Sequence, residues 1–228
     1  MFPIKKDLFD DPDWDKLPFE INEMQENFSR KDFFDELVKV KLDTIPGLNF
    51  NYSNAGANLI GYLLEEIYDK PFEDLLHEKI MIPLKMKNTE ISHSKINKNK
   101  IAYGQNSNKV KMPIRTEKSM NAEGGIFSTV EDMINYLKFH LDEKNTIVSI
   151  SHQHLWNGKY GDFDTGLFWQ VNKNGNNPDI IFQNGGAFGT SSWVSLIPDK
   201  KLGVFIVTNT SGQNIHQKLG DLANKIFE

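Results

Sequence analysis

The 228 residues of this chain include no cysteine. This absence excludes disulfide bonds, thiolate metal sites and a cysteine nucleophile, and it leaves the localisation open. Long apolar runs are missing as well, since none approaches the ~20 residues that a helix needs to cross a bilayer. The first residues also lack the apolar stretch of a secretory signal peptide. We therefore expect neither a membrane span nor a signal peptide in this chain.

The chain has no excess of positive charge. Its 26 Lys and Arg residues are outnumbered by 31 Asp and Glu residues, which gives a net charge of −5. Nucleic acid is therefore not an expected partner, because binding phosphates needs a concentrated basic surface. The basic run at residues 95–100 is short and is expected to be a solvated loop. What the chain does contain, 39% hydrophobic and 25% charged residues, is typical of a globular protein.

Apolar residues recur with helical spacing in the first 140 residues, and turn signals separate the segments that carry them. Ser128 and Glu131 have the spacing of a capping box, which predicts a helix from this point to about His140. The other helices expected in this part are residues 32–41, a helix that starts at Asn54, and a helix that starts at Pro71.

The last third of the chain changes to the two-residue period of strands. The expected strands are residues 165–171, 179–182, 191–197 and 202–209. Residues 198–201 fit a hairpin connection, and residues 215–227 form a closing amphipathic helix. The sequence predicts an α+β fold in a single domain, residues 1–228. Its mostly helical part covers residues 1–120, and its antiparallel sheet with a C-terminal helix covers residues 121–228.

Residues 46–56 combine a turn, a short extended piece and the start of a helix. Tyr52 and Asn54 lie two residues apart, so in an extended piece their side chains share one face. A phenol can relay protons if its pKa is brought below about 10, and an amide beside it can bind a substrate carbonyl or a lysine. In the structural alternative, Tyr52 is a half-buried packing residue and Asn54 is the N-cap of the helix.

Several blocks together resemble the serine β-lactamase and penicillin-binding-protein-like family, and most closely its class C β-lactamase and esterase branch. They are Tyr52-Ser53-Asn54 after a Pro-Gly turn, residues 83–89, residues 121–129, residues 183–192 and the last hairpin, residues 198–209. The resemblance covers roughly residues 40–228, and the order of the blocks is more specific than any one of them. It implies a β-lactamase-like fold and hydrolysis through an acyl-enzyme.

The resemblance implies that Tyr52 is the proton shuttle between nucleophile and leaving group. It implies that Asn54 orients the substrate and contacts the family's lysine. The family's nucleophile lies in a Ser-x-x-Lys motif upstream of Tyr-x-Asn, and this chain has none there. Its one Ser-x-x-Lys, Ser92 to Lys95, lies downstream in a polar loop and is interpreted as a chance match. We therefore expect the chain to lack the family's leading strands and its nucleophile helix.

The resemblance also assigns the glycine-rich stretch to the substrate site. Gln183, Asn184 and Gly185 would line the site on an edge strand. The backbone N–H of Gly186 would be an oxyanion donor, since a carbonyl under attack needs fixed dipoles aimed at its oxygen. The structural alternative for Gly185 and Gly186 is a bulge or a turn. Gln183 stands where the family often has a cation, which favours an ester or amide over a β-lactam substrate.

Two further groups of residues are weaker candidates. His152 and His154 could hold a metal, but no third ligand is spaced nearby, and a helix surface is the preferred interpretation. Asp162 and Asp164 are interpreted as turn formers rather than as paired catalytic carboxylates. No metal site and no cofactor are expected.

These observations leave three hypotheses for the function. The first is a serine hydrolase for small ester, amide or D-amino-acid peptide substrates, with the nucleophile segment outside this chain. The second is a catalytically inactive binding module, and the third is a gene remnant without a selected role. The missing helix would leave an apolar cleft exposed, so self-association or pairing with a complementary N-terminal fragment is expected.

Overall fold

The computed structural model describes residues 10–42, 44–91, 96, 98–115, 119, 121–157, 164–173 and 178–228. Its α-helices are α1 (Leu17–Glu26), α2 (Arg30–Leu37), α3 (Asn54–Tyr68), α4 (Phe72–Leu76), α5 (Val130–His140), α6 (Thr146–His152) and α7 (Ile215–Phe227). Its strands are β1 (Asp164–Thr165), β2 (Gln170–Asn172), β3 (Ile180–Ala187), β4 (Thr190–Ile197) and β5 (Leu202–Thr208). Within the described residues, no helix has both the length and the apolar character needed to cross a bilayer.

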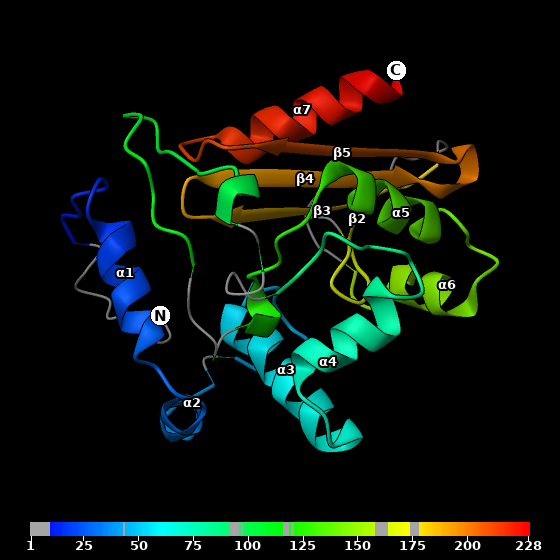
Figure 1. Cartoon of the computed structure of the whole chain (residues 1–228). Helices are drawn as coiled ribbons and strands as arrows, with labels where there is room; N and C mark the ends of the chain where they lie inside the picture. Colours follow the sequence, from blue (N-terminus) through cyan, green and yellow to red (C-terminus); the bar gives the residue numbers. More distant parts are fainter. Residues whose placement is uncertain are drawn as a thin grey trace.

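The strands form one antiparallel sheet in the order β1-β2-β3-β4-β5, so each strand lies beside its neighbour in the chain. Figure 1 shows α7 on one face of this sheet, with α3, α4 and α5 on the other side. A 3-10 turn, Pro198–Lys200, connects β4 to β5 as the expected hairpin. The arrangement confirms the predicted α+β fold, and α7 has the predicted bounds.

The helix cap before α5 differs from the prediction. The N-cap is Thr129, whose side chain accepts a hydrogen bond from Asp132 N. Ser128 instead places its Oγ 2.8 Å from Thr89 Oγ1. The capping box predicted for Ser128 and Glu131 is therefore wrong by one residue, although the helix ends at His140 as expected. Thr and Ser are both good caps, so the sequence pattern alone could not choose between them.

The strand predicted for residues 165–171 is two short strands joined by a turn. Thr165 pairs with Gln170 across this turn, and Phe168 within it has a positive φ of 61°. Gly166 permits the turn to lie against α6, because a Cβ there would be 2.5 Å from Ser151 O. Phe168 is exposed, whereas Trp169 and Val171 are buried. The apolar residues in this stretch therefore do not all belong to one buried strand.

The apolar core has two separate parts. The larger one lies between α5 and the sheet, and it contains Leu137, Trp169, Val171, Ile181 and Leu196. The smaller one joins α2 to α3 through Phe33 and Tyr62, whose rings meet edge to face at 5.1 Å. Burial of large apolar side chains holds α5 against the sheet in the first part and α2 against α3 in the second.

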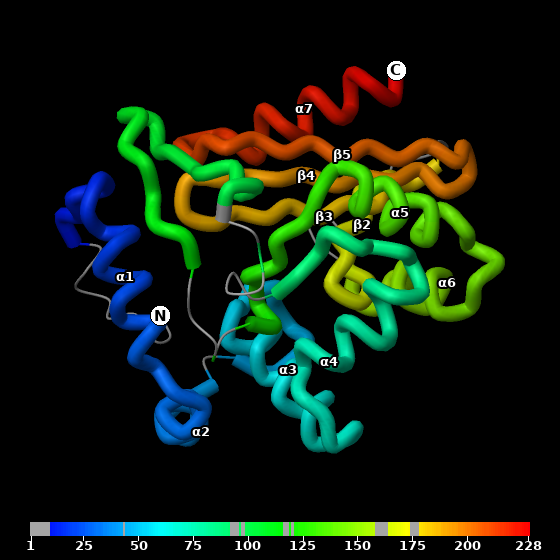
Figure 2. The backbone as a smooth tube through the Cα atoms, in the orientation of Figure 1, coloured from blue at the N-terminus to red at the C-terminus, as the bar shows by residue number. Residues whose placement is uncertain are grey.

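The segment of residues 98–115 is held against the end of the sheet. Gln105 N donates to Gly189 O at 3.1 Å and to Asn209 O at 3.0 Å. Figure 2 shows this segment passing between α1 and the β3–β4 end of the sheet. Gly104 and Gly189 meet backbone to backbone, and a Cβ on Gly189 would lie 2.5 Å from Gln105 N.

Gly189→Ala is expected to destabilise the protein by about 3 kcal/mol, because the new Cβ meets rigid backbone and Gly189 has a φ of +72°. Urea unfolding at pH 7 measures this loss. The matched control is Gly212→Ala, whose Cβ would meet only Ser107 Cβ, at 3.7 Å. Equal stability of the two variants would contradict the tight packing at Gly189.

Candidate active site

The start of α3 leaves Tyr52 and Asn54 accessible. The N-cap of the helix is Ser53, whose Oγ accepts a hydrogen bond from Gly56 N at 2.9 Å. Asn54 is thus the first helical residue and not the cap, so the structural alternative proposed for it is wrong. Tyr52 is 62% exposed and is not a half-buried packing residue either. Both side chains are available for contacts outside the core.

The glycine-rich stretch lies in the second half of β3, where this strand becomes an edge. β2 pairs with β3 only as far as Phe182, which lies opposite Gln170. From Gln183 to Ala187, β3 pairs with β4 alone within the part of the chain that the structure describes. The two glycines pair regularly with β4, so the alternative of a bulge or turn is wrong.

The candidate residues of β3 divide between the two faces of the sheet, because side chains alternate along a strand. Ile181 belongs to the core under α5, and Gln183 and Gly185 face the same side. Asn184 and Gly186 face α7 instead. The face occupied by α3 and α5 therefore carries the side chain of Gln183, whereas Asn184 is directed to the opposite layer.

The loop before Tyr52 is attached to the β1 side of the sheet. Trp156 Nε1 donates to Gly47 O at 3.1 Å, and the Trp156 ring lies 5.9 Å from that of Phe50. Trp156 also forms a bridge with Thr165 of β1. On this same side, the second half of β3 has no strand partner among the residues that the structure describes. The loop and the open edge of β3 are thus placed on one side of the sheet.

A buried ion pair contains the carboxylate that acts electrostatically on the Tyr52 phenol. Arg115 Nη2 is 2.5 Å from Glu123 Oε1, and both side chains are largely buried. The segment that carries Glu123 is held against α3, where Asn58 Oδ1 accepts a hydrogen bond from Ala122 N at 3.4 Å. The covered part of the Tyr52 side chain loses hydration, which raises the pKa of its phenol, and the negative charge of Glu123 raises that pKa further. Both causes favour the protonated phenol.

Two of the motif blocks are joined by one buried carboxylate. Asp132 in α5 accepts hydrogen bonds from Asn88 N and from Thr89 Oγ1, each at 2.7 Å. Glu90 and Phe127 then form an isolated bridge beside it. Residues 83–89 and 121–129 therefore act as a frame that sets the position of the segment next to Tyr52.

Gln183 is engaged in a local network. Its Oε1 accepts from Gln170 Nε2 at 3.1 Å and from Asn184 N at 2.9 Å, and its Nε2 donates to Phe168 O at 2.5 Å. These contacts hold the β1–β2 turn against β3. An amide side chain offers two donors and two acceptor positions, so one N–H of Gln183 has no hydrogen-bond partner among the described residues.

His216 is a residue that the sequence analysis did not single out. It lies in the first turn of α7, and its Nε2 is 3.0 Å from Gly185 O. Ser192 Oγ donates to the same carbonyl at 3.4 Å. A Cβ on Gly186 would lie 3.3 Å from His216 Cε1. No sequence signal pointed to this histidine, because its contact depends on how α7 crosses the sheet.

The other candidate groups have structural contacts. His152 is buried, with Nε2 3.1 Å from His140 Nδ1 and Nδ1 2.5 Å from Glu143 Oε1, so the helix-surface interpretation is wrong for it. Among the described residues, no cluster of His, Asp and Glu side chains has an arrangement suited to a metal ion.

Asp164 is buried in β1 and is not a turn former. Its Oδ2 lies 2.6 Å from Lys173 Nζ and 2.7 Å from His154 Nδ1. These contacts tie β1 to the end of β2 and to the segment after α6. Asp162 and the Ser92 to Lys95 motif lie outside the described residues.

Sequence comparison identifies relatives of known name. A family model described as beta-lactamase matches residues 5–225. The D-alanyl-D-alanine-carboxypeptidase/endopeptidase AmpH of Escherichia coli is 25% identical over 207 residues, which cover 83% of this chain and 53% of that protein. A beta-lactamase of Yersinia enterocolitica is 23% identical, over 74% of this chain and 53% of that protein. This chain thus spans about half the length of these relatives.

Structure comparison finds the same fold. A penicillin-binding protein homologue from Pyrococcus abyssi, described as octameric, matches 92% of this chain and 52% of its own with a TM-score of 0.76 and 20% identity. A class C β-lactamase matches 92% of this chain and 68% of its own with a TM-score of 0.75 and 16% identity. The matched family model covers nearly the whole chain, and the solved structures share its fold. This chain therefore belongs to the β-lactamase family of serine hydrolases.

Proposed function

We propose that this chain carries one part of a serine hydrolase site that cleaves small esters, amides or D-amino-acid peptides through an acyl-enzyme. The observation that carries the proposal is that β3 loses its β2 partner at Gln183, on the side of the sheet that holds the Tyr52 loop. A substrate laid along the open edge would lie beside the glycine backbone. The AmpH relative, named as a D-alanyl-D-alanine carboxypeptidase, supports a D-amino-acid peptide as one substrate class.

In this proposal, each candidate residue has one role. Tyr52 transfers a proton between the attacking hydroxyl and the leaving group, and Asn54 binds the substrate carbonyl. The N–H of Gly186 stabilises the developing oxyanion. Gly185 lets the substrate approach the strand closely. Gln183 contributes its remaining N–H and no charge, which favours an ester or amide over a β-lactam.

We propose that the nucleophile and a cation come from a Ser-x-x-Lys segment outside this chain, and not from the chance match at Ser92 to Lys95. A lysine near Tyr52 would lower the pKa of the phenol, which burial and Glu123 raise in this chain. The lysine would therefore make the phenol a usable base. Without this segment, we propose that the chain alone does not form an acyl-enzyme.

The free edge of β5 is the proposed attachment surface for a complementary segment. β5 ends the sheet and pairs with β4 alone within the described ranges. Helices α5 and α7 both contact β5, and each carries an exposed apolar side chain, Ile134 on α5 and Leu222 on α7. An unpaired strand edge with apolar neighbours accepts an added strand, from another segment or from a second copy of the chain.

The alternative function is a binding module without catalysis. The raised pKa of Tyr52 favours it, since the phenol alone is not a base at neutral pH. Titration with a D-alanyl-D-alanine peptide, followed by tryptophan fluorescence, tests binding without any chemistry. A saturable change in fluorescence, with no acylation in any complex, would support the binding module rather than the enzyme.

The test of the proposal is labelling with a fluorescent penicillin and with a fluorophosphonate ester. The chain alone is expected to remain unlabelled. The chain mixed with the part of E. coli AmpH outside the matched region is expected to show label on the added serine. Labelling of the isolated chain would show that it contains a nucleophile, and no label in any mixture would contradict the hydrolase proposal.

A further inference from the structure

His216 contacts the one peptide unit of β3 whose orientation matters most for the proposed chemistry. The carbonyl of Gly185 and the N–H of Gly186 belong to the same planar peptide group. In a trans peptide these two groups point in opposite directions, so fixing one fixes the other. His216 Nε2 lies 3.0 Å from Gly185 O, within hydrogen-bond distance.

Gly185 and Gly186 are the residues of β3 that most need such support. Neither residue has a side chain to pack, and glycine loses the most conformational freedom when it is ordered. On its outer side, this part of β3 has no strand partner within the described residues. Ser192 Oγ contacts Gly185 O at 3.4 Å, which is a long hydrogen bond. His216 therefore makes the shorter side-chain contact to this peptide group.

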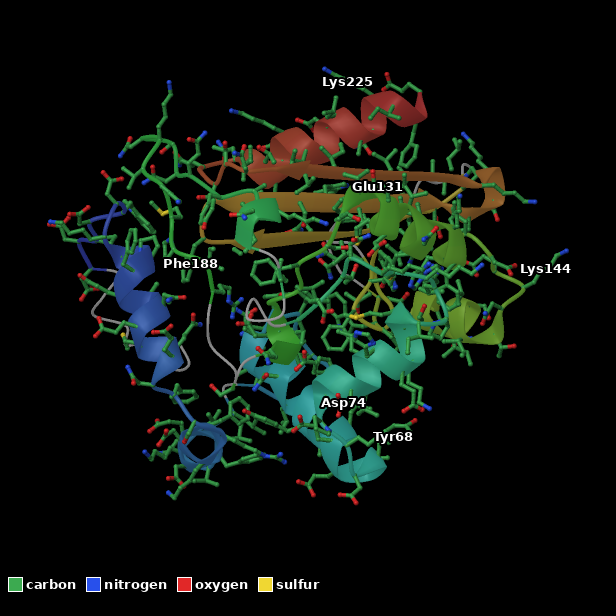
Figure 3. The ribbon with its side chains drawn as sticks, viewed as in Figure 1. Tyr68, Asp74, Glu131, Lys144, Phe188 and Lys225 are labelled. Atoms are coloured by element: carbon green, nitrogen blue, oxygen red, sulfur yellow. The ribbon has the colours of Figure 1, made fainter. Side chains whose placement is uncertain are left out.

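A close approach of α7 to the sheet places His216 there. A Cβ on Gly220 would lie 2.9 Å from Trp193 Cη2, so a larger residue would have to displace the Trp193 ring or move α7 away from β4. His216 precedes Gly220 by four residues and lies on the same face of the helix. Figure 2 shows α7 beginning beside the β3–β4 end of the sheet. The turn at that end contains Phe188, which is labelled in Figure 3.

We infer that His216 is a positioning residue of the active site, which holds the Gly185 carbonyl from the α7 face and so directs the Gly186 N–H to the open edge of β3. The imidazole acts as a donor at Nε2 and does not touch the substrate. This role rests on the proposed function, in which the Gly186 N–H is the oxyanion donor. Helix α7 would thus affect the reaction at the open edge of β3 without contacting the substrate.

The first test uses the isolated chain and requires no activity. NMR spectra are recorded for the unaltered protein, for His216→Ala and for His216→Gln, whose amide nitrogen can replace Nε2. His216→Ala is expected to shift the Gly185 carbonyl carbon and the Gly186 amide signals and to speed the hydrogen exchange of that amide. His216→Gln is expected to restore most of both. Unchanged Gly185 and Gly186 signals in His216→Ala would overturn the inference.

The second test uses the complemented enzyme. Because a misdirected oxyanion donor weakens the transition state more than the bound substrate, kcat in His216→Ala is expected to fall about tenfold with KM nearly unchanged. The Gln variant should recover most of the loss. Gly220→Ala, which displaces α7, should lower kcat in the same way. An unchanged kcat in His216→Ala would overturn the role.

The two proposals fail in different ways. If the complemented protein never becomes acylated, the proposed function fails, while the NMR comparison still decides whether His216 orients the peptide group. If acylation occurs and His216→Ala proceeds at the rate of the unaltered protein, the positioning role fails and the hydrolase proposal stands. Unfolding midpoints of all variants are measured in parallel, so that a loss of folded protein is not mistaken for a loss of rate.

Discussion

Lowering the pH from 7 to 4 is expected to remove about 3 kcal/mol from the free energy of unfolding through a single residue, His140. Burial, together with the smaller effect of the neighbouring His152, lowers the pKa of this imidazole to about 4 from its usual 6.5. His140 is enclosed by aromatic rings, with ring centroids 4.5 Å from Tyr136 and 4.9 Å from Trp169. A positive charge there would lose its hydration.

The sign follows from the order in which the two states bind the proton. The unfolded chain protonates His140 near pH 6.5, whereas the folded protein does so only near pH 4. The stabilisation is therefore complete above pH 6.5, is lost as the pH falls from 6.5 to 4, and changes no further below about pH 4. Among the described residues, Glu143 is the carboxylate that contacts this histidine pair, and it contacts His152 rather than His140.

Urea unfolding at pH 7 and pH 4 measures this effect. His140→Asn removes the titration, and its amide nitrogen can replace the imidazole Nδ1 in the contact with His152. The variant is expected to lose about 3 kcal/mol less than the unaltered protein between the two pH values. Carboxylates that titrate over the same range affect both proteins alike. An identical pH dependence in the two proteins would contradict a neutral, buried His140.

Tyr52→Phe is expected to lower the acylation rate of the complemented enzyme by about 10²- to 10⁴-fold, the usual contribution of a general acid–base group. The substitution removes one oxygen from an exposed ring, so stability should be almost unchanged. Because the phenol transfers a proton in the transition state and does not bind the substrate, the loss of rate should appear in kcat, with KM little affected.

Stopped-flow acylation with a chromogenic ester measures the effect of Tyr52→Phe. Tyr68→Phe is the matched control, because Tyr68 is also an exposed tyrosine but lies at the far end of α3, as labelled in Figure 3. The control should keep the full rate. A Tyr52→Phe enzyme as fast as the control would exclude the phenol as the proton shuttle.

Elements with a strong local signal were predicted well from the sequence. α7 has the predicted bounds because its amphipathic period is uninterrupted, and α3 starts at Asn54 as expected. The strand at residues 165–171 was wrong because its turn depends on contacts with α6 that no local pattern reveals. The sequence also predicted a short strand at residues 179–182, whereas β3 continues through its glycines, since pairing with β4 outweighs their low strand propensity.

The site was predictable only where a residue motif marks it. Tyr52, Asn54 and the glycine stretch of β3 were found by resemblance, and their roles remain predictions. The division of Gln183 and Asn184 between opposite faces follows from the strand register, which the pairing of β3 with β4 sets. His216 and the buried pair of His140 and His152 could not be found, because tertiary packing alone brings their partners together.

The central claim is that the Tyr52–Asn54 motif faces the open edge of β3 across one groove. Because the chain contains no cysteine, Asn54→Cys gives a single attachment point for a nitroxide spin label. The label is expected to broaden the NMR amide signals of Gly185 and Gly186 and to leave those of Leu202 and Gly203 sharp. A label at Lys144→Cys, between α5 and α6, should leave both glycines sharp. If the label at position 54 also leaves Gly185 and Gly186 sharp, the proposed site does not exist.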